Sequence, residues 1–181
     1  MGNAAAGAGI AELMGGNTEE AREWFAKAVE RYGESYEHAP PGSWGRPIGM
    51  LKAHMLAGDL EGAARDAEWT LEQGVGTAES PIGRYAACLA LLVLGRDDEA
   101  RALADGLRTQ PEFPGAVGDA LATIAARDAV GYSEAIEAVL ESFETREEYL
   151  EDLPVADTVI VLERLAARRD LKAELSSPLL P

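Results

Sequence analysis

The chain has 181 residues, of which 32 are acidic and 16 are basic, so its formal net charge is −16. This balance argues against nucleic acid as a partner, because contacts to phosphates require clustered lysine and arginine. A single cysteine, Cys88, excludes a disulfide framework.

The same composition bounds the architecture. Alanine is abundant and aromatic residues make up only 6% of the chain, which favours closely packed helices over a sheet. No run of residues is long and apolar enough to cross a membrane, and the first residues lack the charged start of a signal peptide. We therefore expect one cytoplasmic domain over residues 1–181, with no membrane partner.

The first predicted helices cover residues 3–14 and 18–37, and Thr18 has the residue type that caps a helix start. The second helix carries Trp24 and Phe25 on an apolar stripe that recurs every three or four residues. Such spacing is typical of a core-facing side, so both rings are expected in the core.

The loop over residues 39–47 separates this helix from the next predicted hairpin, residues 47–57 and 59–73. Its prolines and glycines, with Trp44 at the centre, indicate a shaped loop rather than a flexible linker. Trp44 has two interpretations. Its indole either fills a gap between hairpins or contacts a partner protein.

Residues 81–107 form the hairpin around which the chain is organised: an apolar helix, a tight turn at Gly95, and an amphipathic helix. In the first arm, apolar residues from Ile82 to Val93 recur three and four apart almost all round, so neighbours should cover it on several sides. Cys88 lies within this arm and is expected to be a small buried residue in a reducing compartment.

The turn of this hairpin recurs along the chain. Each copy combines a glycine, an acid in the first helical turn and an alanine, and the alanines at 21, 63, 100 and 135 stand 35 to 42 residues apart. This spacing is close to that of tetratricopeptide-type repeats. The chain is therefore predicted to be all-α, a tetratricopeptide-like α-solenoid of about four stacked hairpins. An irregular helical bundle with similar turns is the alternative.

A regular row of acids marks the helix predicted to start near Ser133. Its glutamates step by three and four residues and form one ridge: Glu134, Glu137, Glu141, Glu144, Glu148 and Glu151. We expect Glu137, Glu141, Glu144 and Glu148 to dock a basic protein. The alternative is a solvated outer face, which is what charge runs usually are.

After Pro154 a last helix is predicted, followed by a tail that is apolar for a chain end. Leu175, Leu179 and Leu180 of this tail are expected to pack back onto the last hairpin.

No catalytic or metal-binding pattern rises above background. His38 and His54 are the only histidines, and neither has Cys or His neighbours at metal-ligand spacing. No nucleophile with a base and no phosphate-binding loop stands out. We therefore expect neither an enzyme nor a bound cofactor.

Residues 142–157, the helix 159–169 and the ending 177–181 resemble the Immunity protein 49 family, and residues 41–49 are similar to its haloarchaeal and actinobacterial members. The resemblance implies a cytoplasmic protein that binds and neutralises a polymorphic toxin domain without catalysis. The family offers no catalytic residues to carry over.

The competing hypothesis is a tetratricopeptide-like adaptor that holds a peptide in its concave groove. Such a groove needs polar residues on the first helix of each pair. The corresponding helices, residues 47–57, 81–94 and 115–127, are instead mostly aliphatic and small. This deficit favours the immunity protein hypothesis.

Overall fold

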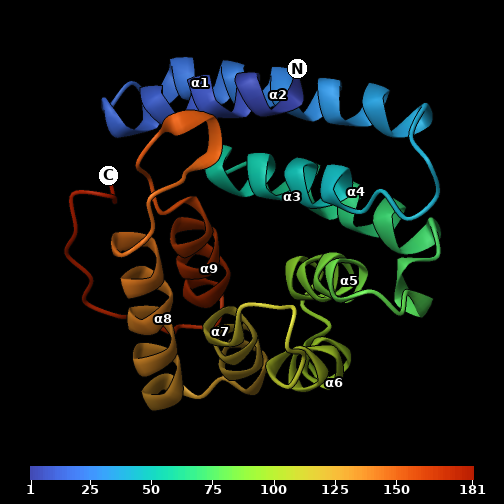
Figure 1. Ribbon diagram of the computed structural model, residues 1–181, viewed down its shortest axis with the longest axis vertical. Helices are drawn as coiled ribbons and strands as arrows, with labels where there is room; N and C mark the ends of the chain where they lie inside the picture. Colours follow the sequence, from blue (N-terminus) through green and yellow to red (C-terminus); the bar gives the residue numbers. More distant parts are fainter.

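A computed structural model describes the backbone of residues 1–181 and every side chain except that of residue 150. The described chain is helical and contains no strand, which confirms the all-α prediction (Figure 1). The helices are α1 (Gly2–Met14), α2 (Thr18–Glu37), α3 (Gly45–Ala57), α4 (Leu60–Glu72), α5 (Pro81–Val93), α6 (Asp97–Arg108), α7 (Gly115–Ala126), α8 (Ala129–Glu144) and α9 (Asp157–Ala167), with short 3-10 turns η1 (Val75–Thr77) and η2 (Leu150–Asp152).

Consecutive helices pair as hairpins, as the repeated turns predict. Gly58 ends α3 and Gly95 follows α5, each with a φ of 74°, a left-handed conformation that glycine adopts without strain. Asp59 then caps α4, because its Oδ1 accepts a hydrogen bond from the backbone N–H of Gly62 at 2.9 Å. Residues in the turns themselves therefore determine where one helix of a pair ends and the next begins.

The fourth hairpin uses the same geometry without the glycine. Arg127 takes the left-handed position with a φ of 54°, and Asp128 caps α8 by accepting from the N–H of Gly131 at 3.1 Å. α8 therefore begins at Ala129, so the predicted start near Ser133 is wrong. α2 likewise begins at Thr18, with Asn17 rather than Thr18 in the cap position.

α9 gives the molecule its most important departure from an open solenoid. It packs on α3, α7 and α8, and Figure 1 shows it enclosed by these helices and α5. Nearly every side of α9 is buried, including Val159, Leu162 and Leu165. The chain's last helix fills the inner side of the hairpin stack, where an adaptor would hold its peptide.

The segments around α9 close the structure further. η2 packs against α1, where a Cβ added to Gly7 would lie 3.2 Å from the Cβ of Glu151. The tail returns along α8 and α9: the carbonyl of Leu179 accepts from the N–H of Ala156 at 2.9 Å. Leu175, Leu179 and Leu180 pack against the core, which confirms that the tail folds back.

Two residues expected in apolar stripes are exposed. Trp24 is 37% and Ile82 is 45% accessible, whereas Phe25 is fully buried. α2 buries a narrow stripe against α1 and α3, and Trp24 lies just beyond its edge, where Lys27 Nζ stands 4.2 Å from the centre of the indole. Ile82 occupies the first turn of α5, before the helix becomes enclosed.

Candidate functional site

α8 has one acidic face and one apolar face. Glu134, Glu137, Glu141 and Glu144 are exposed and follow one another by three or four residues, so they lie on one side of the helix. The helix carries no lysine or arginine. Its opposite side is buried, as predicted, through Ile136, Val139, Leu140 and Phe143.

The predicted ridge is shorter than its sequence period suggests, because α8 ends at Glu144. Beyond it, the Tyr149 hydroxyl donates to the carbonyl of Phe143 at 2.7 Å, and the Arg146 guanidinium lies 3.5 Å from the centre of the Phe143 ring. These contacts fold the segment after Glu144 back against the end of α8. Glu148 is exposed but stands outside the helix, so its inclusion in one continuous helical ridge is wrong.

The acidic face has two further features that the sequence pattern did not indicate. Ser177 of the tail donates a hydrogen bond to Glu144 at 2.8 Å. Val130, one turn before Glu134 on the same side of α8, is 73% exposed. An exposed apolar residue at the head of a row of carboxylates gives this face the mixed character of a protein interface.

Trp44 lies between hairpins rather than on an open surface. It occupies the residue before α3 and is half-buried, with its ring 6.4 Å from that of Tyr36. On the other side it touches α5, where a Cβ added to Gly83 would lie 2.9 Å from the indole Cδ1. This geometry matches the gap-filling interpretation.

Two side chains with catalytic potential, His54 and Cys88, are engaged or buried. His54 contacts Asp59 through Nδ1 at 2.9 Å and Asp66 through Nε2 at 3.0 Å, so both ring nitrogens join α3 to α4. Cys88 is fully buried, burial raises the pKa of its thiol to about 12, and its Sγ lies 3.5 Å from the carbonyl of Ala100. Neither is available as a base or nucleophile.

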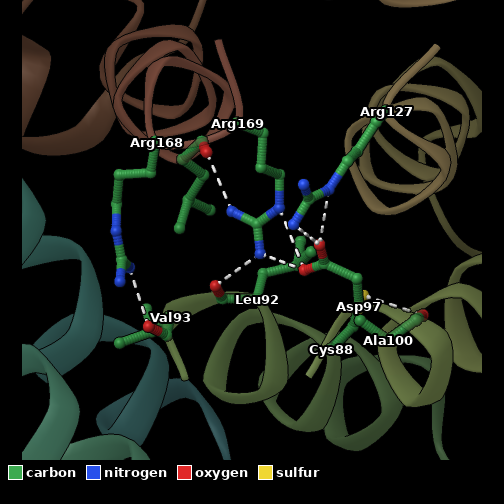
Figure 2. A network of polar contacts seen from close by, with 9 residues as sticks. Cys88, Leu92, Val93, Asp97, Ala100, Arg127, Arg168 and Arg169 are labelled. Atoms are coloured by element: carbon green, nitrogen blue, oxygen red, sulfur yellow. Dashed lines mark hydrogen bonds and ion pairs between the residues drawn. The ribbon is translucent and has the colours of Figure 1, made fainter. Parts of the chain in front are cut away.

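A network of arginines holds α9 in place (Figure 2). Arg169 is buried, and its guanidinium donates to Asp97 and to the carbonyl of Leu92 at 2.8 Å. Arg168 donates to the carbonyl of Val93 at 2.7 Å. These carbonyls lie at the end of α5, where a helix leaves its last acceptors without intrahelical partners. Arg168 satisfies the carbonyl of Val93, and Arg169 joins the N–H of Gly95 on the carbonyl of Leu92.

Arginines also donate to backbone carbonyls at the end of α3. Arg164 of α9 donates to the carbonyl of Met55, and Arg22 of α2 donates through Nε to the carbonyl of Ala57 at 3.3 Å. Sequence reasoning missed these arginines. For Arg164, Arg168 and Arg169 the only signal was their clustering at the end of an apolar helix, where basic residues also complement the helix dipole. Arg22, near the start of α2, had no such signal.

Within the described residues, no group of three His, Cys, Asp or Glu side chains is placed to hold a metal ion. None of the helices described is long and apolar enough to cross a membrane.

No protein-family model, curated protein or solved structure matches the chain. Its function must therefore be inferred from its own residues.

Proposed function

We propose that this protein is a non-catalytic protein-binding module that docks a basic partner on the acidic face of α8. The observation that carries the proposal is the row Glu134, Glu137, Glu141 and Glu144, exposed on one side of a helix without any basic residue. Like charges at this spacing repel by a few tenths of a kcal/mol per pair (~0.3 kcal/mol). A basic surface relieves that repulsion.

Charge on such a face acts mainly on the encounter. Exposed carboxylates steer a basic protein toward the correct orientation and raise the association rate, and the effect decreases as salt increases. Val130, exposed at the head of the row, supplies apolar area that can be buried once the partner is docked.

The concave-groove alternative has less support. A peptide in the groove would need the inner surfaces of α3, α5 and α7, and α9 already covers this side of the stack. An adaptor of that kind requires α9 to leave, which exposes its buried residues to water.

In its more specific form, the proposal identifies the partner as a polymorphic toxin domain. The support is the resemblance of residues 142–157 to the Immunity protein 49 family, a segment that begins in the last turn of α8. A cytoplasmic immunity protein acts by binding alone, in keeping with the engaged state of His54 and the burial of Cys88.

The test compares two variants that remove equal charge. One changes the acidic face, Glu134, Glu137, Glu141 and Glu144, to glutamine. The control changes four exposed glutamates of α2 to glutamine: Glu20, Glu23, Glu30 and Glu37. In α2, unlike α8, basic residues stand between the acids: Arg22, Lys27 and Arg31. Partners are isolated on the wild-type chain from its source cells, identified, and measured for association with all three proteins at low and high salt.

We expect the α8 variant to associate more slowly and with a flatter salt dependence, while the control behaves like the wild type. The α8 variant should fold normally, with equal or slightly higher stability, because repulsion along the helix is removed. Equal rates and salt slopes for the two variants would exclude the acidic face. A toxin domain among the partners supports the specific form, and another basic protein supports only the general one.

A further inference from the structure

A cavity of about 380 Å³ lies where α1, α2, the α3–α4 turn and α9 meet, away from α8. Three arginines line it: Arg22 from α2, and Arg164 and Arg168 from α9. The rest of the wall is largely apolar and includes Leu13, Leu56, Leu60 and Ala167.

The charge of this cavity is unusual for so acidic a protein. The chain has 32 acidic residues against 16 basic ones. Even so, within the part of the chain that the structure describes, no carboxylate pairs with Arg164 or Arg168, whereas Arg22 pairs with Glu19 at 2.6 Å. Burial lowers the pKa of Arg164 and the charge of Arg22 lowers it further, and together they outweigh the opposite effect of Glu163. The cavity therefore concentrates positive charge from Arg164 and Arg168, which the nearby charges of Glu163 and Asp97 offset only in part.

Helix capping accounts for only part of the donor capacity of these arginines. Arg164 donates one hydrogen bond, to Met55, and Arg168 donates one, to Val93. A guanidinium presents several N–H groups in a planar fork that matches a carboxylate. Beyond these capping bonds, the two side chains have donors left to offer to an anion in the cavity.

The apolar wall of the cavity indicates that the uncharged part of a ligand would be apolar. Leu60 is 47% exposed although it lies beside the cavity, so a ligand there would cover apolar surface that the fold leaves open. Met55 and Ala57 also line the cavity, and their carbonyl oxygens already accept from Arg164 and Arg22. These oxygens disfavour a doubly charged phosphate more than a singly charged carboxylate.

The geometry points to a binding site for an organic carboxylate with a short apolar body. The carboxylate accepts hydrogen bonds from Arg164 and Arg168, and the body lies against Leu13, Leu60 and Ala167. The ligand is either a free organic acid or the carboxyl terminus of a peptide, since both present the same chemistry. The site shares no residue with the acidic face of α8.

The experiment titrates the full chain with hexanoate, followed by NMR shifts of backbone amides. Hexanamide, which has the same body without the charge, is the negative control, and inorganic phosphate tests the choice of anion. A tripeptide ending in leucine, with a free or an amidated carboxyl terminus, tests the peptide source. The variants are Arg164→Gln and Arg168→Gln, and glutamine at 164 can still donate to Met55.

The matched control is Arg96→Gln. Arg96→Gln removes the same charge as each cavity variant, but Arg96 pairs with Glu99 at 2.6 Å on the surface and lies away from this cavity. We expect hexanoate or the free tripeptide to shift amides of residues 56–60 and 164–168. Each cavity variant should weaken this binding by about tenfold, the loss expected for one charge-assisted hydrogen bond, while Arg96→Gln leaves it unchanged.

The stronger of the two carboxylates identifies the source, and either one supports the site. Equal binding of hexanamide, tighter binding of phosphate than of both carboxylates, or no localised shift with either carboxylate would overturn the inference. The α8 variant with four glutamines serves as an independent check. It should bind hexanoate like the wild type, so the failure of one site leaves the other intact.

Discussion

Asp97 connects three helices through its carboxylate. It begins α6, and its Oδ2 lies 3.1 Å from Nη2 of Arg127 at the end of α7, while Oδ1 accepts from Arg169 beyond α9. Only 3% of the Arg169 side chain and 14% of the Asp97 side chain are exposed. Removing Asp97 leaves the charge of Arg169 without compensation, although the Arg169 side chain is almost wholly buried.

We predict that Asp97→Ala lowers the free energy of unfolding by about 3–5 kcal/mol at neutral pH. Urea denaturation measures it. Asp105→Ala is the control, because Asp105 forms exposed pairs with Arg101 and Arg108, which contribute about 1 kcal/mol or less. Equal effects of the two substitutions would show that the Asp97 pair does not hold the helices together.

The cost of Asp97→Ala should also depend on pH. Burial acts to raise the pKa of Asp97, but the hydrogen bonds and charges of Arg169 and Arg127 outweigh it, so this pKa falls below its ordinary value of 3.8. A depressed carboxyl pKa stabilises the folded state above the unfolded pKa and loses this contribution as pH falls through the folded one. The difference between wild type and variant should therefore be full above about pH 5 and shrink below about pH 4.

Cys88 provides a second test at the scale of one residue. Because the thiol is fully buried and burial raises its pKa to about 12, we predict that it reacts with thiol reagents only when the protein opens. Maleimide labelling should be slow in the native protein and rise in proportion to the unfolded fraction in urea. Rapid, complete labelling of the native protein would place Cys88 at the surface.

At the scale of the element, small residues determine how closely neighbouring helices approach. On α7, a Cβ added to Gly118 would lie 3.0 Å from the backbone nitrogen of Arg108 and 3.2 Å from the carbonyl carbon of Leu107. Backbone atoms at the end of α6 cannot rotate away as a flexible side chain can. Gly118 therefore allows α6 and α7 to pack at short distance.

Gly118→Ala should lower the free energy of unfolding by about 1–2 kcal/mol, because overpacking outweighs the better helix propensity of alanine. Gly115 on the same helix is the matched control, since nothing lies within 4 Å of an added Cβ there. Gly115→Ala should raise stability by about 0.5–1 kcal/mol. Changes of the same sign for both, measured by thermal or urea denaturation, would contradict close packing at Gly118.

The helices could largely be predicted from sequence because their ends are determined locally. A glycine and an acid mark the α3–α4 and α5–α6 turns, and the core-facing stripes have helical spacing. The start of α8 was misplaced because Arg127 fills the left-handed position without a glycine signal. The end of α8 was misplaced because glutamate spacing continues past Glu144, whereas the contacts that stop the helix involve Tyr149 and the Phe143 carbonyl.

At the scale of the whole molecule, the position of α9 follows from contacts that no local pattern encodes. Its apolar positions predicted a helix, but not that it packs inside the stack. Arg164 bonds to Met55 on α3, and Arg168 to Val93 on α5, across most of the chain. The arginine-lined cavity depends on this arrangement and therefore could not be predicted from sequence. The acidic face of α8 could be predicted from sequence, because all its glutamates belong to one helix.

The central α9 should also change how the protein unfolds. In an open solenoid each repeat contacts only its neighbours, so stability is nearly a sum of local terms and the ends can open independently. Here α9 touches α3 from the second hairpin together with α7 and α8 from the fourth. Loss of its packing should weaken hairpins that are distant in the chain, and the molecule should unfold as one cooperative unit.

We predict that Leu162→Ala, which empties a fully buried position on α9, lowers the free energy of unfolding by about 2–5 kcal/mol. Native-state hydrogen exchange should show the loss in the slowest amides of α3 and of α7 alike, since both helices pack on α9. Leu60→Ala is the size-matched control, because Leu60 is 47% exposed and its truncation should cost less than about 1 kcal/mol. If protection falls only in α7 to α9 while α3 keeps its wild-type exchange, the hairpins open separately and α9 does not join them.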